Sequence, residues 1–158
     1  MRLQRHMEYI QDELMGRRVI IFILLLALFL VACVPAYQRY IEGSYVGSSS
    51  SELFPLLDEL VKGDGFIFLR TWEKPLRYTM IADYEKYDER IQKKIYLIIF
   101  LKDIDERKDQ TEFLITVDGL GNEKPIKRAV DKAFEDLVEK IKSRFEKSKF
   151  RIDKMSQP

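Results

Sequence analysis

The chain combines one long apolar run with a longer stretch in which apolar and polar positions alternate. The run covers residues 19–32 and holds fourteen apolar residues in succession. After it, apolar residues recur at helical spacing in two segments and at strand spacing in four. This pattern predicts an N-terminal apolar signal or anchor helix, followed by a domain that mixes helices and strands.

Two segments have the three-and-four spacing of an amphipathic helix, residues 52–62 and residues 125–145. Ser51 is a suitable N-cap for the first, and Gly63 is placed to end it. The second carries a longer apolar stripe and gathers basic residues towards its C-terminal end, as the helix dipole prefers. Each helix is therefore expected to cover another layer of structure with one face.

Four segments between these helices have the composition and alternation of strands. They cover residues 66–71, 77–84, 94–102 and 111–118. The polar residues 85–94 and the charged residues 103–110 are expected to connect them. Four consecutive strands with short connections favour an antiparallel meander.

The order of elements predicts the fold class. We expect an α+β two-layer sandwich, in which an antiparallel sheet of about four strands packs against two amphipathic helices in the order α-β-β-β-β-α. One face of the sheet would then be exposed. The strand over residues 95–101 is apolar on both faces, so something is expected to cover part of that exposed face: the tether, a partner or a second copy of the chain.

The end of the apolar run resembles the lipobox of bacterial lipoproteins. The residues are Leu30-Val31-Ala32-Cys33, and the run follows the basic pair Arg17-Arg18. The resemblance implies cleavage between Ala32 and Cys33 and attachment of lipid, including palmitate-type acyl chains, to Cys33. In that family, Val34 in place of Asp after the Cys implies an outer-membrane address on the periplasmic face, where the cell has two membranes.

The N-terminus allows a second interpretation in two respects. Eighteen residues precede the apolar run, more than such signals usually have, and a start at Met15 would give a signal of ordinary proportions. The run is short for a spanning helix, which needs about 20 residues. Counted on through Ala36, however, it approaches the lower limit, so an uncleaved single-pass signal anchor is the alternative.

These observations divide the chain into four parts. Residues 1–32 are expected to be a signal peptide, residues 33–51 a lipidated tether, residues 52–150 the globular domain and residues 151–158 a flexible tail. In either interpretation of the N-terminus, Arg17 and Arg18 stay in the cytoplasm and the domain is exported.

Charge and chemistry narrow the function. The chain has 27 basic and 26 acidic residues, and residues 1–32 hold four Arg and three acids, so the exported part is electrically balanced. Such a balance gives no support to nucleic-acid binding. The single His and the single Cys, His6 and Cys33, both lie in or beside the signal, which leaves no imidazole or free thiol for catalysis or a metal site in the mature chain.

The remaining candidates for a catalytic or metal-binding site are groups of acidic residues, and a structural role is favoured for them. Residues 103–109 contain four acids and loosely resemble a calcium loop. Arg107, however, stands where an oxygen ligand is needed and Lys108 where Gly is needed, so a solvated turn is favoured. We expect no catalytic residues, no metal and no cofactor.

One group of side chains suggests a surface for a partner. Trp72 lies close in sequence to Arg70 and Arg77, and the three could form an exposed aromatic–cation patch. Sealing the end of the sheet is an equal alternative for Trp72. The sequence therefore predicts a lipid-anchored, non-enzymatic binding or assembly module of the cell envelope, which binds an envelope protein or itself. A lipid- or glycan-binding carrier is the further alternative.

Overall fold

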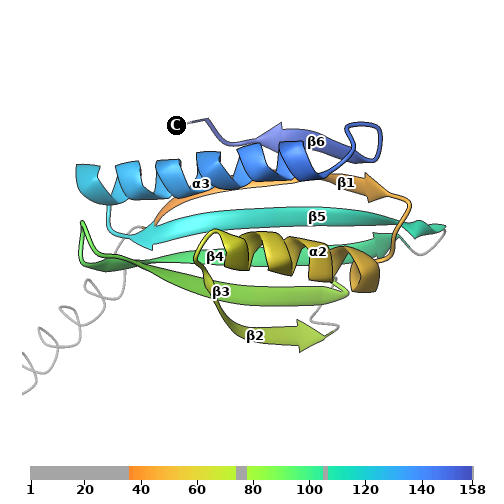
Figure 1. Ribbon diagram of the computed structural model, residues 1–158, viewed down its shortest axis with the longest axis horizontal. Helices are drawn as coiled ribbons and strands as arrows, with labels where there is room; N and C mark the ends of the chain where they lie inside the picture. Colours follow the sequence, from red (N-terminus) through yellow and green to blue (C-terminus); the bar gives the residue numbers. More distant parts are fainter. Residues whose placement is uncertain (1–35, 74–77, 105–106, 158) are drawn as a thin grey trace, which may run out of the picture. The chain divides into compact units, whose positions relative to one another are not determined.

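The computed structural model describes residues 36–157, with gaps at 74–77 and 105–106. These residues form a six-stranded antiparallel sheet and two helices (Figure 1). In chain order the elements are β1 (Ala36–Val46), α2 (Ser50–Gly63), β2 (Ile67–Glu73), β3 (Met80–Asp88), β4 (Lys93–Ile104), β5 (Arg107–Leu120), α3 (Lys124–Arg144) and β6 (Phe150–Met155). The strand order across the sheet is β2-β3-β4-β5-β1-β6.

The predicted α+β class and both helices are confirmed, whereas the predicted number of strands is wrong. The four strands from β2 to β5 form the expected meander, in which neighbours along the chain are neighbours in the sheet. Two strands are added at the β5 edge. The order is therefore β-α-β-β-β-β-α-β rather than α-β-β-β-β-α.

Both additional strands come from segments predicted to lack regular structure. Residues 36–46 of the predicted tether form β1, which pairs with β5 along its whole length. Residues 150–155, largely within the predicted flexible tail, form β6, which pairs with β1. Both segments are ordered because their backbone N–H and C=O groups form hydrogen bonds with neighbouring strands of the sheet.

Both helices pack on one face of the sheet, which we call the covered face (Figure 1). Alternate side chains of each central strand point into this layer, among them Leu97 of β4 and Ile115 of β5, both fully buried. From the helices, Leu57 of α2 and Leu137 of α3 meet them, also without exposure. Burial of a side chain of this size stabilises the fold by about 1.5–3 kcal/mol.

A buried arginine on the covered face fixes the C-terminal strand. Arg39 of β1 donates to Asp131 of α3 at 2.6 Å and to the side chain and carbonyl of Ser156 at 3.1 and 3.0 Å. Its guanidinium also lies 4.6 Å from the ring centroid of Phe134. These contacts satisfy a charge that would otherwise be costly to bury, and they join β1, α3 and the end of the chain.

Candidate partner-binding surface

No helix or strand among the described residues lies over the other face of the sheet, which we call the open face. Cross-strand pairing arranges its side chains in rows perpendicular to the strands. One row runs Trp72, Ile81, Phe100 and Leu114, because the register pairs these residues in succession from β2 to β5. The open face therefore has an apolar row that crosses four strands.

The apolar row is accessible to a partner. The Trp72 side chain is 46% exposed, and Ile81, Phe100 and Leu114 are half-buried. Tyr40 of β1 and Ile98 of β4 extend the apolar surface in the next row, where both pair with Thr116 of β5. A contiguous apolar surface of this kind on a small domain is typical of an interaction site.

Two members of the predicted aromatic–cation patch lie together at the β2 edge of this surface. The Arg70 guanidinium lies 4.5 Å from the ring centroid of Trp72, and Arg70 donates to Asp83 at 2.7 Å. The Trp72 indole N–H donates to the same Asp83 oxygen at 3.3 Å. Asp83 thus orients both side chains. Arg77, the third predicted member, lies outside the described residues.

Most charges of the open face are paired across neighbouring strands. Lys94 contacts Glu85 at 2.8 Å, and Lys102 contacts Glu112 at 3.3 Å. Such exposed pairs contribute little to stability. They leave the open face nearly neutral, so its exposed character is set by its apolar side chains rather than by net charge.

Two polar groups of β5 on this face have no partner among the described residues. The Thr116 hydroxyl is buried and accepts and donates no hydrogen bond. Asp118, two residues further along the strand, has no hydrogen bond or ion pair either, and burial raises the pKa of its carboxyl. An unpaired buried polar group such as the Thr116 hydroxyl is costly, so it marks a place where a partner can supply a hydrogen bond.

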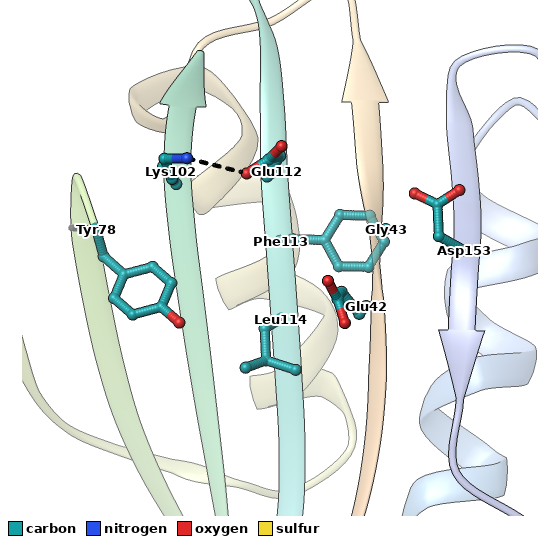
Figure 2. A pocket seen from close by; sticks show the side chains of 8 residues that line it. All are labelled: Glu42, Gly43, Tyr78, Lys102, Glu112, Phe113, Leu114 and Asp153. Atoms are coloured by element: carbon teal, nitrogen blue, oxygen red, sulfur yellow. Dashed lines mark hydrogen bonds and ion pairs between the residues drawn. The ribbon is translucent and has the colours of Figure 1, made fainter. Parts of the chain in front are cut away.

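The open face is also hollowed at two adjoining places. A hollow of about 390 Å³ is lined by Ile98, Phe100 and Leu114 and, among its polar residues, by Thr116. Figure 2 shows the second, of about 250 Å³, whose lining includes Tyr78, Leu114 and the paired Lys102 and Glu112. The two hollows share Glu42 and Leu114, so together they form one shallow groove along β5.

Asp103, one of the acids of the predicted charged turn, has a structural role. The Asp103 carboxylate accepts from the backbone N–H of Ser50 at 2.6 Å and from its hydroxyl at 2.8 Å, and from Thr111 at 3.2 Å. It therefore caps the start of α2 and ties the helix to the sheet. Within the described ranges, no group of three or more acids, His or Cys is placed to hold a metal ion.

The predicted processing site, Ala32 and Cys33, lies outside the described residues, as do Met15 and His6. In the part of the chain that the structure describes, neither helix is long and apolar enough to cross a membrane. A comparison with protein-family models finds no match, and a comparison with curated proteins finds none either.

The sequence identified some of this surface and missed the rest. Trp72 and Arg70 were identified by residue type, and residues 111–118, which include Leu114 and Thr116, were correctly predicted to form a strand. The unpaired state of Thr116 and Asp118 was missed. It depends on what their cross-strand neighbours offer, and that required the register of β1 and β4 against β5.

Proposed function

We propose that the chain is a lipid-anchored cell-envelope protein, exposed outside the cytoplasmic membrane, whose domain is a non-enzymatic binding or assembly module. The observation that carries the proposal is the apolar row of the open face, from Trp72 to Leu114. A row of this kind buries apolar surface when a partner docks, which is the main driving force of association.

The two helices support this assignment of the binding surface. Their apolar stripes are already used against the covered face, where Tyr84, Phe113 and Phe134 are among the largest fully buried side chains. Large side chains thus occupy the layer between helices and sheet, and no observation favours a carrier that holds a ligand there. The open face is left as the surface to which an envelope protein binds.

Site-specific photocrosslinking tests the binding surface. A benzoylphenylalanine is placed at Phe100 on the open face or, as a control, at Glu135 on the exposed side of α3, in the full chain in intact cells. We expect one discrete crosslinked product from position 100 and none from position 135. Equal crosslinking from both positions, or none from position 100, would contradict the proposal.

A second experiment tests the anchor. Cells expressing the chain are labelled with a palmitate analogue, and the Cys33→Ser variant serves as the control. We expect label and a mature chain beginning at acylated Cys33, with loss of label and a retained precursor in the variant. An intact unlabelled chain would favour the uncleaved signal anchor with the same exported domain.

A further inference from the structure

Little chain separates the membrane anchor from the folded domain. Only Val34 and Pro35 lie between Cys33 and the first residue of β1, Ala36. Three residue steps reach at most about 11 Å when fully extended. The distance is equally short if the apolar run is an uncleaved helix, because that helix would leave the bilayer at nearly the same residues. In both forms of the anchor, Ala36 lies close to the membrane.

Several elements begin or end beside Ala36. The register places Ala36 opposite Leu120, the last residue of β5, and Ala36 also bridges to Gly121 just before α3. Within β4, Ile95 pairs with Gly119, so the β3–β4 turn lies at the same end of the sheet (Figure 1). We call this end, with Tyr87, Leu120, Lys124, Lys127 and Arg128, the proximal end.

The exposed apolar side chains of the proximal end suit a bilayer interface. Leu120 and Tyr87 are each 55% exposed. The contact of an exposed leucine with water is unfavourable, and an apolar environment would remove it. A tyrosine combines an apolar ring with a hydroxyl, and tyrosines are enriched where the hydrocarbon of a bilayer meets its headgroups.

The start of α3 adds cations directly after its acidic N-cap residue, Glu123, which contacts Lys93 at 3.7 Å. Its first turn contains no acidic residue, although the N-terminus of a helix carries a partial positive charge. Lys124 and Arg128 are exposed, and neither has an ion pair with a described residue, while Lys127 lies 5.3 Å from the ring centroid of Tyr37. This arrangement is unfavourable in isolation and favourable beside phosphate groups.

We propose that the proximal end is a membrane-docking surface that rests on the headgroups of phospholipids. The inference rests on the membrane anchor of the proposed function, in either of its forms, and adds an orientation to it. Four acids also lie at this end, so charge contributes modestly and the short link dominates; they are Asp88, Glu89, Asp118 and Glu123. Docking places β1 at a steep angle to the plane of the bilayer, so its far end, Val46, lies about 33 Å further from the membrane than Ala36. The open face then points along the membrane plane rather than towards it.

Fluorescence quenching by lipid tests this orientation. The single tryptophan is first removed by Trp72→Phe, and a new one is placed by Leu120→Trp or, as the matched control, Val46→Trp. Val46 is also an exposed apolar residue, 45% exposed, at the opposite end of β1. Each full chain is reconstituted into phosphatidylcholine–phosphatidylglycerol vesicles with bromine on the acyl chains near the headgroups.

We expect bromine to quench at least half of the fluorescence from position 120, and at least fivefold less from position 46. A chain that floats with the vesicles after a carbonate wash but shows equal quenching at both positions, or none at 120, overturns the docking surface alone. A chain that does not float overturns the anchor of the proposed function, and the docking surface with it.

Charge variants of α3 test the cationic part. Combining Lys124→Glu with Arg128→Glu should reduce the quenching at position 120 by about half. Combining Lys142→Glu with Lys147→Glu, near the other end of α3, should leave it unchanged. An unchanged melting curve by circular dichroism shows that each variant is folded. Equal effects of the two double variants on the quenching would contradict a role of Lys124 and Arg128 in docking.

Discussion

Two arginines of the sheet have the same kind of neighbours in opposite surroundings. Arg39 on the covered face contacts Asp131 at 2.6 Å and the ring of Phe134, and its side chain is 4% exposed. Arg70 on the open face contacts Asp83 at 2.7 Å and the ring of Trp72, and its side chain is 62% exposed. The local chemistry is the same, so burial decides what each cluster does.

The buried cluster holds the fold together, because a charge removed from water becomes costly when its partners are lost. The exposed cluster contributes little to folding, since water screens and solvates its charges. It remains available for a partner. The same distinction extends to the two faces of the sheet as a whole, and matched substitutions on the two faces test it.

The largest difference is expected for leucines of the two faces. Leu97→Ala on the covered face should lower the free energy of unfolding by about 3 kcal/mol, because it opens a cavity in the core. Leu114→Ala on the open face should cost about 1 kcal/mol, since that side chain is already half-hydrated. Urea unfolding at pH 7 measures both. Equal costs would mean that the open face is part of the core.

The two arginine clusters give the next difference. Arg39→Ala should cost about 2 kcal/mol, below the range for fully buried pairs because Asp131 is 26% exposed. Arg70→Ala should cost about 0.5 kcal/mol or less. Thermal and urea unfolding test these values. If Arg70→Ala cost as much as Arg39→Ala, burial would not be the deciding variable.

Two threonines of β5 should respond with opposite signs. The Thr111 hydroxyl donates to the carbonyl of Ser48 at 2.9 Å, so Thr111→Val should cost about 1.5 kcal/mol. The Thr116 hydroxyl is buried and unpaired, so Thr116→Val should raise the free energy of unfolding by about 0.5 kcal/mol. Urea unfolding tests both changes. A loss of stability from Thr116→Val would show that the hydroxyl has a partner in solution.

The smallest effect concerns Asp118 and depends on pH. Burial raises the pKa of this carboxyl, so the folded protein holds the proton more tightly than the unfolded chain does. The stability linked to that proton is fully present below the unfolded pKa of about 3.9 and is lost as the pH rises through the folded pKa. Asp118→Asn should therefore stabilise the protein at pH 7 and not at pH 3.5.

Asp88 provides a control of opposite sign for that experiment. Its side-chain hydrogen bond with Arg90 lowers the pKa of Asp88, so this carboxylate contributes stability above the unfolded pKa and loses it as the pH falls through the folded pKa. Asp88→Asn should destabilise the protein at pH 7 and not in acid. Parallel pH dependence of the two variants would contradict the assigned surroundings.

The fold was predictable from the sequence where apolar residues recur at a regular spacing. Both helices have such spacing, and the four strands of the meander were found by their alternation or their apolar composition. β1 was missed because Arg39 and Gly43, two of its residues on the covered face, are not of the apolar types that mark the buried face of a strand. Gly43 is needed because a Cβ there would collide with the carbonyl of Arg151 and the ring of Phe113. Those neighbours belong to strands distant in sequence.

The candidate surface was predictable only in part, for a related reason. Residue type marked Trp72 and Arg70 as suited to recognition, but their common partner Asp83 follows from the pairing of β2 with β3. The Ile98–Thr116–Tyr40 row likewise requires the register of three strands. Features that depend on pairing between distant segments are not encoded in local alternation.

The position of β1 beside β6 has a consequence for how the protein folds. Arg39 and Ser156, which contact each other, are 117 residues apart in the chain. Pairing segments this distant in sequence costs chain entropy before their contacts stabilise the fold. We therefore expect folding to be slow for a domain of this size. A chain that is synthesised or threaded N-terminus first exposes β1 early and completes its edge of the sheet last. β1 therefore lacks its neighbour β5, and then its neighbour β6, until nearly the whole chain has emerged.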